Sequence, residues 1–142
     1  MRRFTPLLLL AVLAPVRSPA QSTRGFTHAD TLRGSIGPAR AWWDVAFYDL
    51  HVRVNPADSS IRGWNGITYR VLAPAHEMQI DLQEPMIVDS MVQDGRTLAS
   101  RRDGNAFFVT VPGSQRVGAL RTVTVYYHGK PIAARRAPWD GG

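Results

Sequence analysis

The feature that most constrains the fold is an alternation of apolar and polar side chains that recurs between Trp42 and Tyr127. Successive side chains of an extended strand point to opposite sides, so a period of two is typical of a strand with one apolar face. The clearest case covers residues 48–54, where Tyr, Leu, Val and Val alternate with Asp, His and Arg. This segment predicts a half-buried strand, and no stretch of ten residues shows a comparable helical period.

Seven segments of this kind are separated by turn residues. They cover residues 48–54, 61–71, 78–82, 86–93, 97–98, 107–111 and 122–127. Asp94-Gly95 predicts a tight hairpin turn, and Asp103-Gly104-Asn105 predicts a second turn. Short connections favour antiparallel pairing, and no βαβ unit or internal repeat is evident. The sequence therefore predicts an all-β fold, an antiparallel β-sandwich or saddle-like sheet of about seven strands.

The N-terminal residues have the pattern of an export signal. Arg2 and Arg3 precede an apolar run at 7–16, and the small residues at 18–20 suit a signal peptidase. The run is shorter than the roughly 20 apolar residues that span a bilayer, and an uncleaved anchor is the alternative. We predict a signal peptide at 1–20, a flexible lead-in at 21–41 and one β domain at 42–142. The predicted location is the periplasm or the extracellular space, with no stable membrane span after cleavage.

The charge of the chain argues against nucleic acid as a partner. The whole sequence has a formal net charge of +6, but without the predicted signal it has 14 basic and 11 acidic residues, a charge of +3. A basic stripe with interleaved aromatic residues, which is typical of nucleic-acid binding, is absent. The chain also has no cysteine. Core burial, or packing on another domain, therefore has to stabilise it.

No set of residues predicts a reactive centre. The four histidines, at 28, 51, 76 and 128, lack metal-ligand spacing. His76-Glu77 begins like the zinc motif HExxH, but Ile80 stands where the second histidine is needed. No serine lies in a nucleophile motif, and nothing in the sequence pairs Asp81 with Asp89 as acid and base. We therefore assign no catalytic residue, no cofactor-binding residue and no metal ligand.

The tryptophans are interpreted as core or interface anchors in preference to a ligand platform, because large aromatic side chains most often have that role. They are Trp42, Trp43, Trp64 and Trp139.

Six segments, in order, resemble the zinc aminopeptidases of the aminopeptidase N type. Residues 44–56, DVAFYDLHVRVNP, resemble the opening strand of that family, and IRG at 61–63 resembles the strand after it. IDL at 80–82 resembles the family's short LDL strand, and VDS at 88–90 with DG at 94–95 resembles the next. VYYHGKP at 125–131 and PWDGG at 138–142 complete the series. The resemblance covers roughly residues 42–142.

This resemblance implies the N-terminal β domain of such an enzyme. In the family this domain is saddle-shaped, non-catalytic and packed against a thermolysin-like catalytic domain, whose active-site cleft it walls. Zinc, the general base and the GxMEN loop are implied only for that catalytic domain, which would be a partner in cis or in trans. We expect the 142 residues alone to be inactive and to expose an apolar surface for their neighbour.

Other interpretations stay open. The chain could be a gene fragment, the product of a split gene or an independent module. The alternative function is a stand-alone exported β-sandwich that binds protein or carbohydrate. A decayed remnant without function is a third possibility.

Overall fold

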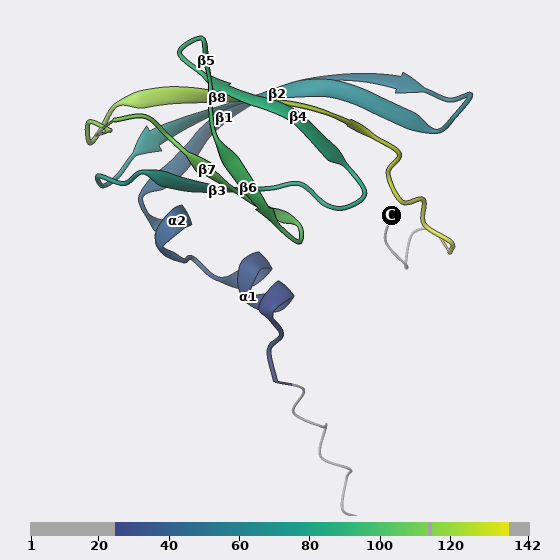
Figure 1. Cartoon of the computed structure of the whole chain (residues 1–142), viewed down its shortest axis with the longest axis horizontal. Coiled ribbons are helices and arrows are strands. Elements are labelled where there is room, and N and C mark those ends of the chain that lie inside the picture. The colour runs from purple at the N-terminus through teal and green to yellow at the C-terminus, as the bar shows by residue number, and fades with distance from the viewer. Residues whose placement is uncertain (1–24, 114, 137–142) are drawn as a thin grey trace, which may run out of the picture.

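The computed structural model describes residues 25–113 and 115–136, and Figure 1 shows their arrangement. The predicted signal peptide at 1–20 and the PWDGG segment at 138–142 lie outside the described residues. In chain order the elements are α1 His28–Gly34, α2 Pro38–Ala41, β1 Trp43–Asn55, β2 Ser60–Val71, β3 Glu77–Asp81, β4 Ile87–Gln93, β5 Arg96–Thr97, β6 Ser100–Asp103, β7 Ala106–Thr110 and β8 Leu120–Gly129. No helix in this part of the chain is long and apolar enough to cross a membrane.

The strands of the described residues form two antiparallel sheets. The larger sheet has the order β1-β2-β8-β4-β5, and the smaller sheet has the order β3-β7-β6. The smaller sheet lies under only part of the larger one, and the far end of the β1–β2 hairpin projects beyond it (Figure 1). The predicted all-β sandwich is confirmed.

One short strand was not predicted from the sequence. Strand β6 pairs with β7 from Ser100 to Asp103, but its two arginines interrupt any apolar alternation. The guanidinium carbon of Arg101 lies 4.0 Å from the centre of the Phe108 ring, and that of Arg102 lies 4.9 Å from the centre of the Phe107 ring. Arginine stems and aromatic faces therefore replace the apolar pattern that strand prediction depends on.

The core lies between the two sheets. The larger sheet contributes Ile67, Tyr69, Val71, Met91, Val123 and Val125, and the smaller sheet contributes Met78, Ile80, Phe107 and Val109. Trp42 and Trp43 each present a ring edge-on to Tyr69, at centroid distances of 5.7 and 5.8 Å. The indole N–H of Trp42 donates to the backbone oxygen of Glu77 at 2.7 Å, so this buried polar group has a partner.

Two predicted turns are confirmed. Asp94 and Gly95, with φ of 50° and 73°, connect β4 to β5. Positive φ at both central residues is the geometry that suits the twist of a hairpin and that glycine and aspartate tolerate. The second turn joins Asp103 of β6 to Ala106 of β7, with Gly104 at φ 56°.

Regular structure begins earlier than predicted. The sequence indicated that order starts near Trp42, but α1 and α2 lie within the predicted lead-in. Thr27 caps α1: its hydroxyl accepts from the amide of Asp30, and the Asp30 carboxylate accepts from the amide of Thr27. Both helices are too short for a periodic pattern, so they are visible in sequence only through such caps.

The prediction that β1 is half-buried was wrong. Its apolar side chains alternate as predicted, but none of them from Tyr48 to Val54 is buried, and the exposed fractions range from 47% at Val52 to 62% at Val54. The core reaches only the start of β1, where Trp43 and Val45 pack against it, and it does not cover residues 48–54. The alternation therefore predicted the side on which the apolar residues lie, and it did not predict their cover.

Candidate functional site

An uncovered row of apolar side chains on β1 is the most unusual surface of the described residues. We call it the open row, and it consists of Tyr48, Leu50, Val52 and Val54. Strand register places these residues opposite Ile67, Asn65, Gly63 and Ile61 of β2. Ile67 is a core residue, so the open row lies on the same face as the core, which we call the inner face.

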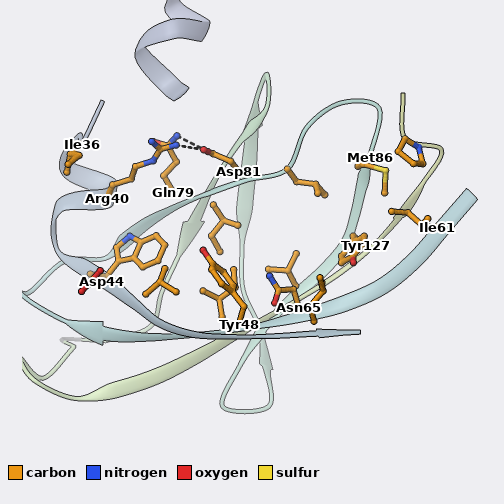
Figure 2. A pocket seen from close by; sticks show the side chains of 18 residues that line it. Ile36, Arg40, Asp44, Tyr48, Ile61, Asn65, Gln79, Asp81, Met86 and Tyr127 are labelled. Atoms are coloured by element: carbon orange, nitrogen blue, oxygen red, sulfur yellow. Dashed lines mark hydrogen bonds and ion pairs between the residues drawn. The ribbon is translucent and has the colours of Figure 1, made fainter. Parts of the chain in front are cut away.

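The inner face is hollowed where the smaller sheet ends. A cleft of about 870 Å³ lies there, and its apolar part includes Trp43, Tyr48, Leu50, Ile61 and Tyr127. Figure 2 shows Tyr48, Asn65, Ile61 and Tyr127 lining its floor. An exposed apolar patch of this kind on a small domain typically marks a protein interface or a ligand groove.

A polar group closes one end of this cleft. Arg40 of α2 forms an ion pair with Asp81 at the end of β3 (Figure 2). Gln79 donates to the second carboxylate oxygen of Asp81 at 3.0 Å, and also to the backbone oxygen of Leu32 at 3.0 Å. These contacts attach both short helices to the smaller sheet. They leave Arg40 and Asp81 satisfied by each other, so this end of the cleft is structural.

Asn65 is the exception among the polar groups that line the cleft. Its side-chain oxygen is buried and has no hydrogen-bond partner among the described residues. A buried acceptor without a partner costs about 1–3 kcal/mol. Asn65 pairs in register with Leu50, so this polar atom lies beside the open row.

Strand β1 is also the edge of its sheet. It pairs with β2 on one side, and it has no strand on the other side within residues 25–113 and 115–136. The strand is 13 residues long and contains neither proline nor lysine, two of the residues that commonly protect such edges. Its backbone edge and its open row therefore adjoin each other on one long hairpin arm.

A close backbone contact holds this arm together. A Cβ atom added at Gly63 would lie 1.9 Å from the backbone oxygen of His51, which no side chain allows. Glycine is therefore required at this point, because it lets β2 approach β1 more closely than any other residue would. The structure thus shows a close backbone approach at this glycine.

The histidines do not come together. His28 pairs with Asp103 at 2.9 Å, His51 with Asp49 at 3.0 Å and His128 with Asp89 at 2.6 Å. His76 precedes β3, and Glu77 forms an ion pair with Arg101 at 3.5 Å. The carboxylates of Asp81 and Asp89 have different partners, Arg40 and His128. No group of three or more histidine, cysteine, aspartate or glutamate side chains within the described residues could hold a metal ion.

The tryptophans take different roles. Trp42 is buried in the core and Trp43 packs against it, as anchors would. Trp64 instead lies on the outer face of the larger sheet, where its ring stacks on that of His51 at 3.8 Å. Trp139 lies outside the described residues. The interpretation as anchors is thus correct for two of the three that the structure describes.

Sequence reasoning did not identify the open row as a site, because a strand of half-exposed valines has the same pattern as a half-buried one. The sequence signal that could have identified the open row is a difference in strand length. The strands of the smaller sheet are too short to cover the whole apolar face of the long β1–β2 hairpin. The smaller sheet has only three strands, two of them of five residues and one of four, against two strands of 13 and 12 residues in the β1–β2 hairpin.

Comparisons with known proteins find the same fold. A mutant of the M1 zinc metallopeptidase from Deinococcus radiodurans superposes with a TM-score of 0.61 at 23% identity, covering 73% of this chain and 24% of that chain. The same enzyme solved with a Tyr-Ser-Ala substrate gives the same values. Leukotriene A4 hydrolase from Saccharomyces cerevisiae gives a TM-score of 0.50 at 15% identity, over 62% of this chain and 15% of that chain.

These likenesses show the fold. The chain spans about a quarter of the length of the Deinococcus enzyme, a share consistent with one N-terminal domain. No protein-family model and no curated protein matches the chain. The resemblance found in the sequence is therefore confirmed as a likeness in fold to part of the M1 zinc metallopeptidases.

Proposed function

We propose that the chain is a non-catalytic structural domain of the aminopeptidase N type, which docks on a zinc aminopeptidase catalytic domain in cis or in trans. It walls one side of the active-site cleft of that domain and so restricts entry to short peptides. The export signal predicted at residues 1–20 would place this assembly in the periplasm or outside the cell.

The open row is the observation that supports docking. Four large apolar side chains stand about half exposed on one strand, beside a cleft on the same face. Fully burying an aliphatic or aromatic side chain contributes about 1.5–3 kcal/mol. Covering the exposed half of these four would contribute roughly 3–6 kcal/mol to docking on the same scale. This contribution favours a partner that covers the open row.

Zinc fits the partner and does not fit this domain. Structural and catalytic zinc sites take three or four histidine, cysteine or carboxylate ligands around one ion. Three of the described histidines, His28, His51 and His128, are each paired with a single aspartate, and no group of three possible ligands occurs among the described residues. We therefore derive no chemical step for this domain.

The experiment begins with the 142-residue chain alone and then adds any HExxH-bearing protein that the same or the next reading frame is found to encode. Alone, with or without zinc, the chain is expected to release no amino acid from an aminoacyl substrate. With the catalytic protein it is expected to form a complex, measured by calorimetry. Zinc-dependent hydrolysis by the pure chain would contradict the non-catalytic assignment.

Strand β1 offers a matched pair of variants. Leu50→Glu places a charge in the open row and is expected to weaken the complex about 30-fold, the equivalent of about 2 kcal/mol. Phe47→Glu places the same charge on the same strand at an equally exposed residue, 61% against 60%, that register assigns to the other face. It is expected to leave the affinity unchanged. Equal effects of both variants, or none, would sink the docking proposal.

A further inference from the structure

The outer face of the larger sheet carries a second concave site, which the docking proposal does not use. Strand pairing places His51, Trp64 and Tyr126 side by side on β1, β2 and β8. We call these three residues the aromatic row. Strand pairing also places Arg53, Arg62 and His128 side by side on the same three strands. We call these three residues the basic row. Both rows line one hollow of about 640 Å³, together with Asp89.

The basic row contains two arginines without a counter-ion. Arg53 and Arg62 are directly opposite each other, and both are exposed. Neither forms an ion pair with any described carboxylate, whereas Arg40, Arg101, Arg102 and Arg121 each have one. Like charges directly opposite on neighbouring strands are destabilising. An anion between the two guanidinium groups would remove this repulsion and satisfy both.

The nearby carboxylates are already engaged. Asp89 contacts the ring of His128 at 2.6 Å, and Asp49 contacts the ring of His51 at 3.0 Å. Each aspartate therefore orients an imidazole that lines the hollow, and of the two only Asp89 lines the hollow itself. The remaining lone pairs of the Asp89 carboxylate can accept from hydroxyl groups.

Two members of the aromatic row are stacked on each other. The rings of His51 and Trp64 are stacked, with 3.8 Å between their centres and 17° between their planes. Gly63, one residue from Trp64, lets β2 approach the backbone of His51 closely. Tyr126 stands opposite Trp64 with 41% of its surface exposed, so it offers an accessible ring face or edge beside the stacked pair.

We propose that this outer site binds a sugar acid, a saturated ring that carries one carboxylate. The two rows are two residues apart along each strand, about 6.6 Å. A carboxylate held by the arginines at about 2.8 Å places an attached six-membered ring above the aromatic row. Arginine matches the two oxygens of a carboxylate, aromatic rings pack against the apolar side of a sugar, and Asp89 accepts a hydroxyl hydrogen.

The test titrates the full chain with galacturonate, trigalacturonate, galactose and a triglutamate peptide, by calorimetry at low salt. Galacturonate or its trimer is expected to bind. Binding of the trimer alone identifies an anionic polysaccharide as the source, and binding of the monomer too identifies the free acid. Galactose is expected not to bind, and triglutamate is expected to bind at least tenfold more weakly. Equal binding of triglutamate and trigalacturonate would overturn the proposal, because charge alone would then explain it.

Three variants locate the site. Arg62→Gln and Tyr126→Ala are each expected to weaken galacturonate binding about tenfold, the value of one charge-assisted hydrogen bond or one lost ring contact. Arg96→Gln, an exposed arginine of β5 outside the hollow, is expected to leave the affinity unchanged. All three residues are exposed, so the circular dichroism spectrum should not change. Loss of binding in Arg96→Gln, or full binding in Arg62→Gln, would overturn the assignment.

Discussion

The covered and the open halves of the inner face carry the same kind of side chain and differ in what lies over them. Tyr69 and Val123, in the covered half, have 0% of their surface exposed, whereas Leu50 and Val54, in the open half, are about 60% exposed. Both halves belong to the same sheet and follow the same period of two. The difference shows that alternation determines the face of the sheet on which an apolar side chain lies. Whether that side chain is buried depends on whether the second sheet is long enough to cover it.

The largest expected effect is a loss of folding stability when the covered half of the inner face is disrupted. Tyr69→Ala removes the ring on which Trp42 and Trp43 pack, and it leaves a cavity between the sheets. Replacing a large buried aromatic residue by alanine typically costs about 3–5 kcal/mol. The free energy of unfolding, measured by urea titration, should fall by that amount. A loss below about 1 kcal/mol would show that the core is not organised around this ring.

The second effect concerns the β1–β2 arm. Gly63→Ala would force β1 and β2 apart, because the new Cβ would lie 1.9 Å from the backbone oxygen of His51. Forcing atoms into a packed site typically costs about 1–3 kcal/mol. Gly66→Ala, on the same strand, is the control, since its nearest neighbour would be at an ordinary 3.5 Å. Urea titration of both variants should show a loss only for Gly63→Ala, and equal losses would contradict the close approach.

A smaller effect follows from the ionisation of buried tyrosine. Burial raises the pKa of Tyr69 above its ordinary value, and burial also raises that of Tyr127. The unfolded chain therefore loses these protons at lower pH than the folded chain does. The contribution of these two tyrosines to stability should be constant below about pH 10, the unfolded pKa, and should fall as the pH rises above it. Tyr69→Phe should flatten this decline in urea titrations between pH 9 and 11, and an unchanged slope would contradict the prediction.

The smallest effect is expected in the open half. Leu50→Ala removes an exposed side chain that the isolated domain does not bury, so the free energy of unfolding should change by no more than about 0.5 kcal/mol. The contrast with Tyr69→Ala then sharpens the comparison between the two halves. A loss of 2 kcal/mol or more would mean that the open row is covered in solution, for instance by a second copy of the chain.

Much of the fold could be predicted from the sequence, because strands and turns are local. The alternation at 61–71 correctly predicted that Ile67, Tyr69 and Val71 share a buried face, and Asp94-Gly95 correctly predicted a hairpin. The two helices could not be predicted, since four to seven residues are too few for a period. Strand β6 was missed because arginines that lie over Phe107 and Phe108 take the place of apolar residues.

The candidate sites could be predicted far less well, because they depend on how strands are placed side by side. The stacking of His51 on Trp64 joins two neighbouring strands, whereas the sequence showed only the alternation within each strand. It could not show that Arg53 and Arg62 stand opposite each other, since the two residues come from different strands and meet only in the observed register. The exposure of the open row likewise depends on the length of another sheet.

The free backbone edge of β1 has a practical consequence for anyone who produces this chain. Its outward amide and carbonyl groups can continue a sheet with any extended peptide, and its apolar side chains would favour such additions at high concentration. Overproduction without a natural neighbour should therefore yield inclusion bodies. Co-expression, dilution during refolding, or a single proline introduced on the edge would be the means to obtain monomers.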